Sequence, residues 1–222
     1  MEPGAIAPHL PFPTFVVTIP QGRCWVEPQR HSSAICDNMA VITPDRTLLQ
    51  DVSRYYPWPL PGCPRPQQTY HPLLKAEPTL PPVRYLEGRV ALLSGLSGHI
   101  YYHWLMDVLP RLDLLRRGGW TWGDIDAFVV NSTQRAFQRE TLALLGIPET
   151  KIIESDRHPH LQAAELIVPS FPGYFGWVPQ TTLKFLRSHF LPPPTPSHPP
   201  HSPTPPLTLT SISVVPRPVI VT

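Results

Sequence analysis

The sequence predicts an α/β protein in three parts: a β-rich segment with a proline-rich connection over residues 1–83, an α/β domain over 84–191, and a disordered proline-rich tail over 192–222. Three observations support this division. Short apolar runs before residue 84 are separated by polar or proline-bearing links, strand-like and helix-like patterns alternate from 84 to 191, and no Asp, Glu or Lys occurs after Lys184. Strands alternating with helices are typical of a mostly parallel sheet joined by right-handed crossovers.

Composition excludes several classes of protein. The chain has 222 residues, and its 33 prolines argue against a helical bundle, because each internal proline removes a backbone donor. The hydrophobic share of 41% is enough for one core, so global disorder is excluded. A net charge of +2 without a basic block gives no reason to expect a nucleic-acid partner.

The cellular compartment is inferred from the first 20 residues, from the length of the apolar runs and from the cysteines. We expect no secretory signal, because prolines interrupt the first 20 residues, and no membrane span, because no apolar run is long enough. The cysteines, Cys24, Cys36 and Cys63, are odd in number and lack CxxC spacing, so neither disulfides nor a zinc site are expected. These features favour a reducing, cytoplasmic location.

The β-rich segment is predicted from four apolar runs, at residues 15–19, 24–26, 35–43 and 47–53. The turn chemistry of Pro44-Asp45-Arg46 separates the last two runs, because proline presets the backbone for a tight turn. We therefore expect a small antiparallel meander, followed by a proline-rich connection over 57–82.

The α/β domain begins with a buried strand at 90–94, and its first helix is predicted over 101–117, where leucines recur at helical spacing before Gly118-Gly119. Pro110 lies inside this helix and is expected to kink it, because proline cannot bond to the carbonyl of Met106.

The remaining elements of the domain follow in order. A strand at 127–130 precedes a helix capped by Asn131, Ser132 or Thr133 and closed by Gly146. Short strands are predicted at 151–153 and 165–168, and a last helix at 181–190 places Leu183, Leu186 and Phe190 on one face. The tail from 192 is dominated by Pro, Ser, Thr and His, and such a segment buries too little surface to offset its ordering entropy.

The stretch from Ser94 to Leu115 carries the chemistry. A buried strand runs into the turn Gly95-Leu96-Ser97-Gly98 and then into a helix, which places free amides at the edge of the sheet where open α/β sheets bind ligands. His99, His103 and Asp107 follow at intervals of four and share a helix face. Asp107 can orient His103, which makes the two a usable general-base pair.

Each of these residues also has a structural interpretation. His103 and Asp107 could be a buried hydrogen-bonded pair that fixes the helix, and Tyr101, Tyr102 and Trp104 could be packing residues. Arg111 could bind a phosphate or pair with Asp107. A metal site is not expected, because no further ligand cluster accompanies the histidines.

The segment from His103 to Asp107 also fits the HxxxD pattern of acyltransferases that use thioesters. Those enzymes usually have glycine after the aspartate, where this chain has Val108. An HxxxD-type acyltransferase is therefore one alternative function.

Four separated motifs resemble the N-terminal half of the family-61 glycosyltransferases, especially bacterial members. They are AVITPDRTLLQDVSR, LSGLSGHIYYHWLMDVLPRLDLLRR, FVVNSTQRAFQRETLALLGIPETKIIE and HLQAAELIVPSFPG, and they occur in the family's order over roughly residues 17–191. The resemblance implies the Rossmann-like half of a GT-B-type architecture. It also implies transfer of a sugar from a nucleotide-sugar donor to a hydroxyl group of a glycan, protein or lipid acceptor, with the donor as co-substrate and no bound metal or cofactor.

The family's motif of an aromatic pair, a histidine and an aspartate matches Tyr101, Tyr102, His103 and Asp107, and Pro110-Arg111 matches the residues that follow. By this resemblance His103 is the base or the group that positions the acceptor, and Asp107 orients it. The residues expected to contact substrate are Ser97, Gly98, His99, Tyr102 and Arg111.

The resemblance ends near Pro192, and such enzymes bind their donor largely through the C-terminal domain. We therefore expect a truncated glycosyltransferase that lacks most contacts to the donor. We also expect the tail to be translated out of frame, because codons that encode the residues from Thr210 onward can be read in a shifted frame as a strand followed by a basic motif. The alternative is a non-catalytic protein that binds a partner through the face left exposed.

Overall fold

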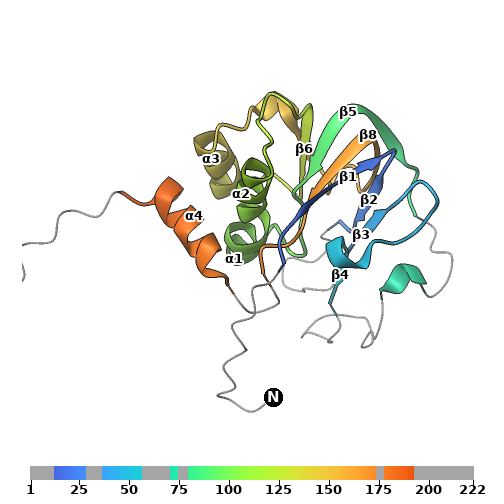
Figure 1. Ribbon diagram of the computed structural model, residues 1–222, viewed down its shortest axis with the longest axis horizontal. Helices are drawn as coiled ribbons and strands as arrows, with labels where there is room; N and C mark the ends of the chain where they lie inside the picture. The colour runs from blue at the N-terminus through green and yellow to red at the C-terminus, as the bar shows by residue number, and fades with distance from the viewer. Residues whose placement is uncertain (1–12, 29–36, 57–70, 75–79, 174–177, 193–222) are drawn as a thin grey trace, which may run out of the picture. The chain divides into compact units, whose positions relative to one another are not determined.

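The computed structural model describes residues 13–28, 37–56, 71–74, 80–173 and 178–192 (Figure 1). The strands of these residues form one eight-stranded sheet with the order β4-β3-β2-β8-β5-β6-β7, and β1 also pairs with β8. Strands from both sides of the predicted boundary at residue 84 thus belong to the same sheet. The predicted tail beyond Pro192 and most of the 57–82 connection lie outside the described residues.

The parallel part of the sheet consists of β5 (Arg84–Leu92), β6 (Ala127–Val130), β7 (Ile152–Glu154) and β8 (His160–Pro169). All four strands are predicted by the sequence, but β5 and β8 begin several residues earlier than their apolar runs suggest. The chain passes outward from β5 to β6 and β7, and then returns to β8 on the other side of β5.

The antiparallel part consists of β1 (Val16–Pro20), β2 (Arg23–Val26), β3 (Asn38–Ile42) and β4 (Arg54–Tyr55). The expected meander is present only in part, as β2-β3-β4, because β1 pairs with β8 and not with β2. The sheet is nevertheless mixed rather than mostly parallel, because β1 and β2 pair antiparallel with successive stretches of β8. The ten-residue β8 is long enough to accept both strands on the edge opposite β5.

The predicted strand at 47–53 is wrong. Residues Gln50–Val52 form a short 3₁₀ helix, η1, before β4. The Ser53 hydroxyl explains the turn, because it donates to the carbonyl of Leu49 at 2.6 Å and accepts from the amide of Val41 at 2.9 Å. A side chain that bonds to nearby backbone in this way competes with strand pairing.

The first long helix is built from α1 (Tyr101–His103), a π-helical turn η3 (Trp104–Val108) and α2 (Pro110–Arg117). In the π turn the amide of Leu109 donates to the carbonyl of Trp104 at 3.0 Å. Pro110 then occupies the first position of α2, where a missing N–H costs nothing. The helix distortion predicted at Pro110 is thus a single π-helical turn that precedes the proline.

Two other helix predictions need correction. The helix after β6, α3 (Ala136–Leu144), begins after Arg135, whose amide donates to the Gln138 side chain at 3.0 Å, so none of Asn131, Ser132 and Thr133 caps it. In α4 (Gln180–Phe190) Leu186 and Phe190 of the predicted apolar face pack against the core, beside the buried Thr182 and Phe185. Leu183 is 45% exposed, so the prediction is wrong for this residue alone. Gly146, with φ of 77°, closes α3 as expected.

Two apolar clusters enclose the sheet. Successive residues of β5, β6 and β8 point alternately into one cluster and the other, as the pleat requires. The helices cover one cluster (Figure 1), and the antiparallel strands share the other with β5, β6 and β8. In the described part of the chain, no helix is long and apolar enough to cross a membrane.

Candidate functional site

The candidate site lies where β5 and β8 end. The chain leaves β5 toward β6 but returns to β8 on the opposite side, so the connections diverge between these two strands. Ligands of open α/β sheets bind at such a point, outside the carboxyl ends of the strands. Here the segment Ser94–Gly98 follows β5, and Ser170–Gly173 follows β8.

The loop after β5 is fixed from two sides. Asn131, at the end of β6, accepts a hydrogen bond from the Gly95 amide at 2.9 Å and donates to the Gly95 carbonyl at 2.8 Å. A β-carbon at Gly98 would collide with the Asn131 carboxamide, so only glycine fits there. Asn131, which the sequence suggests as a helix cap, instead supports this loop.

Ser97 is held by Asp37, a residue that the sequence analysis did not single out. The Asp37 carboxylate accepts from the Ser97 amide at 2.6 Å and from its hydroxyl at 3.1 Å, and Ser97 adopts a left-handed φ of 55°. Burial raises the pKa of Asp37, and the hydrogen bond from the Ser97 amide opposes that effect. Ser97 and Gly98 are fully buried, so in this structure they shape the loop and do not open onto the surface.

His103 and Asp107 form a hydrogen-bonded pair at this site. The Nδ1 atom of His103 lies 2.8 Å from Oδ2 of Asp107, and their side chains are 17% and 22% exposed. Both belong to the first long helix, where His103 ends α1 and Asp107 lies in the π turn. Single-turn π bulges within α-helices are frequent at functional sites, because the extra residue redirects side chains. Partial exposure leaves the pair reachable by a ligand.

Arg54 adds a positive charge to this pair from the other part of the sheet. Its guanidinium lies 3.9 Å from Oδ1 of Asp107, donates to the Gly173 carbonyl at 2.5 Å, and stacks 3.5 Å from the centre of the Phe171 ring. The side chain is 12% exposed. Arg54 is the last residue of one of the motifs that carry the family resemblance. Its separation from Asp107 in the sequence follows no helical or strand period, so the sequence does not predict their contact.

Arg111 serves neither of the two roles that the sequence left open. It is completely buried, and its guanidinium donates to the carbonyls of Ser94 at 2.7 Å and Pro169 at 2.6 and 3.1 Å. Burial lowers its pKa to about 9. Arg111 thus ties the end of β5 to the end of β8, beneath the site.

His99 and Tyr102 lie on the partly exposed side of the helix start. The two ring nitrogens of His99 are buried and have no hydrogen-bond partner among the described residues, and burial followed by the charge of His103 lowers its pKa. Tyr102 is 46% exposed, and its ring meets the His103 ring edge-on with centroids 5.3 Å apart. Of the expected substrate contacts, these two flank His103.

A cavity of about 720 Å³ lies elsewhere, beside β7, and shares no residue with the His103 site. Among the described residues, no group of three or more His, Cys, Asp and Glu side chains could hold a metal ion.

The site belongs to an α/β protein with a mixed sheet. Comparisons with protein-family models, curated proteins and solved structures found no match.

Proposed function

We propose that this chain is a glycosyltransferase of the family-61 type, in which His103 acts on the hydroxyl group of the acceptor. The single observation that carries the proposal is the His103–Asp107 hydrogen bond of 2.8 Å at the carboxyl end of β5. The strand order β7-β6-β5-β8 supports it, because this is the order of the first four strands in nucleotide-binding Rossmann sheets.

The geometry suggests how the pair would work. With Nδ1 of His103 donating to Asp107, the lone pair of the other ring nitrogen, Nε2, is left to accept a proton. The acceptor hydroxyl gives this proton to Nε2 while its oxygen bonds to the anomeric carbon of the donor sugar. The bond from that carbon to the nucleoside diphosphate breaks, and the diphosphate leaves with the electron pair.

Asp107 would favour the imidazolium that forms in this step, because a carboxylate at hydrogen-bond distance stabilises positive charge on the ring. Arg54 lies 3.9 Å from the second carboxylate oxygen of Asp107, and this ion pair would help to orient the carboxylate. In this proposal Arg54 and Asp107 are positioning residues, and His103 is the catalytic residue.

The test is release of nucleoside diphosphate from a panel of nucleotide sugars mixed with simple hydroxyl acceptors. His103→Ala is expected to lower the rate about 100-fold or more, the usual contribution of a general base. Asp107→Asn is expected to lower it less, because the variant keeps His103 and loses only the carboxylate that orients it. His189→Ala, which removes an exposed histidine of α4, serves as the control and should match the unaltered chain.

The proposal fails if the folded chain neither turns over nor binds any nucleotide sugar at millimolar concentration. That result would favour a non-catalytic protein. Equal rates for the His103→Ala and His189→Ala variants would remove His103 from the reaction even if turnover were seen.

A further inference from the structure

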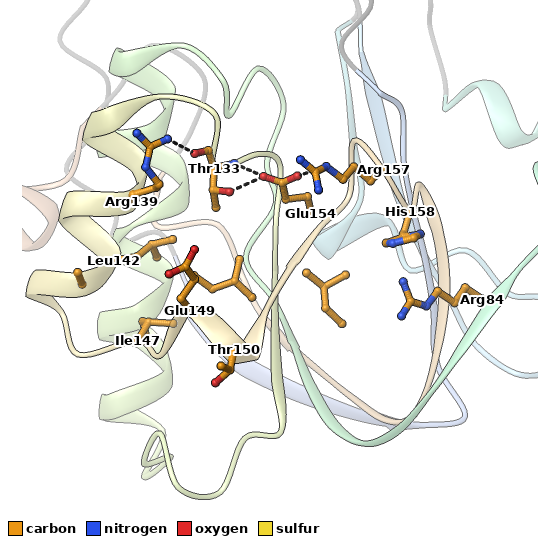
Figure 2. A pocket seen from close by; sticks show the side chains of 13 residues that line it. Arg84, Thr133, Arg139, Leu142, Ile147, Glu149, Thr150, Glu154, Arg157 and His158 are labelled. Atoms are coloured by element: carbon orange, nitrogen blue, oxygen red, sulfur yellow. Dashed lines mark hydrogen bonds and ion pairs between the residues drawn. The ribbon is translucent and has the colours of Figure 1, made fainter.

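The cavity beside β7 is lined by one stretch of the chain, residues 133–158, together with Arg84. That stretch runs from the residue Thr133 before α3, through α3 and β7, to the connection that leads to β8, and Arg84 comes from the start of β5 (Figure 2). A β-bulge at residues 86–89 divides β5, and such bulges bend a strand. Arg84 precedes the bulge, at the start of β5, and its side chain lines the cavity beside β7.

One end of this cavity is cationic. Arg84, Arg157 and His158 gather there, and Figure 2 shows the Arg84 and His158 side chains next to each other. Burial lowers the pKa of His158, and the nearby charges of Arg84 and Arg157 lower it further. The positive charges of Arg84 and Arg157 thus lie near each other at this end of the cavity.

Among the described acidic groups, Glu154 pairs with Arg157, and this pair leaves the charge of Arg84 uncompensated. Glu154 is already engaged by Arg157 at 2.6 Å and by the amide and hydroxyl of Thr133. Within the described part of the chain, Arg84 and His158 have no carboxylate partner. Arg84 therefore carries a positive charge without a described counter-ion at this end of the cavity, and a bound anion would pair with it.

The opposite end of the cavity has an apolar wall with two polar residues beside it. The wall is made by Leu142, Ala143, Ile147, Ile152 and Ile153, and the polar residues are Glu149 and Thr150. Arg139 on the same helix is turned to the backbone, because it donates to the carbonyls of Thr133 and Gln134 at 2.7 and 3.0 Å. A volume of about 720 Å³ is in the range of cavities that hold a small organic ligand.

We propose that this cavity binds a phosphate monoester with an apolar or aromatic body. The phosphate would lie against Arg84, Arg157 and His158, since arginine forks match phosphate geometry and a dianion suits several cations. The body would lie against the Leu142–Ile147 wall. This site goes beyond the proposed glycosyl transfer and is independent of it.

The experiment is a titration of the isotope-labelled chain with phenyl phosphate, followed by NMR chemical shifts. Arg84→Ala and His158→Gln are each expected to weaken binding about ten-fold or more, the usual effect of losing a charged hydrogen bond. Arg187→Ala, which removes an exposed arginine of α4, controls for net charge and should leave the affinity unchanged.

A second pair of variants tests the cavity separately from its charge. Ala143→Phe places a ring in the cavity and should weaken binding, whereas Leu144→Phe, at an exposed position on the same helix outside the cavity, should not. Glycerol phosphate and benzoate should bind more weakly than phenyl phosphate, because the first lacks the apolar body and the second lacks the dianion.

Several results would overturn this assignment. They are the absence of saturable shifts with phenyl phosphate, an equal loss in Arg187→Ala and Arg84→Ala, an unchanged affinity in Ala143→Phe, or benzoate or glycerol phosphate binding as tightly as phenyl phosphate. His103→Ala should leave binding unchanged, so failure of the proposed glycosyl transfer and failure of this site are distinguishable.

Discussion

Replacing Arg111 by methionine separates a structural role from a ligand-binding role. The variant removes the donors to the carbonyls of Ser94 and Pro169, at the ends of the two central strands. Each buried carbonyl left without a donor costs about 1–3 kcal/mol, and relief from burying the guanidinium offsets part of this. That guanidinium is costly to bury, as its pKa near 9 indicates.

We expect a net loss of about 2–4 kcal/mol in the free energy of unfolding. For a domain of this size, that loss corresponds to a fall in Tm of about 5–15 °C. Urea denaturation followed by tryptophan fluorescence measures the free energy directly, because the chain has 6 tryptophans. The fluorescence midpoint and slope give the stability of both variants under the same conditions.

The control is Arg117→Met on the same helix. Arg117 makes an exposed pair with Asp113 at 3.1 Å, and such surface pairs contribute about 0–1 kcal/mol. If Arg111→Met unfolds within about 0.5 kcal/mol of the Arg117→Met variant, the structural role is refuted. A loss of ligand binding at unchanged stability would return Arg111 to the role of an anion ligand.

Two further predictions concern buried ionisable groups. Because burial raises the pKa of Asp37 above 3.8, the native state holds its proton to higher pH than the unfolded state does. The stability of the chain relative to Asp37→Asn should therefore fall as pH rises through the native pKa of Asp37, as measured by urea denaturation; an opposite slope would contradict the assignment. Burial also raises the pKa of the Cys24 thiol to about 12, so iodoacetamide should modify Cys24 in urea but hardly in the folded chain, as peptide mapping would show. Equal rates in both states would disprove this burial.

Local patterns predicted the elements of the α/β domain well. The apolar run at 127–130 became β6 without a shift, and the four-residue spacing of His103 and Asp107 placed the two side chains within hydrogen-bond distance. Both results depend on contacts close in sequence. The misplaced strand at 47–53 had the same local basis, but there a serine side chain bonded to the backbone and formed a turn.

The remainder of the candidate site could not be read from local patterns. Asp37, just before β3, and Arg54, in β4, reach it from the antiparallel part of the sheet, and their positions depend on how β2 and β3 pair beside β8. Arg111 follows the period of the leucines around it, but periodicity does not reveal that an arginine will satisfy two buried carbonyls. The cavity beside β7 likewise joins residues 133–158 to Arg84, which is distant from them in sequence.

The pairing of the first strand with the last has a consequence for synthesis. The Phe15 amide donates to the Ser170 hydroxyl across a separation of 155 positions, and β1 meets β8 along its whole length. During translation the first strands therefore emerge long before their partner, and exposed strand edges of this kind are prone to mispairing. This topology therefore requires that the nascent chain stay free of aggregation until residue 169 has left the ribosome.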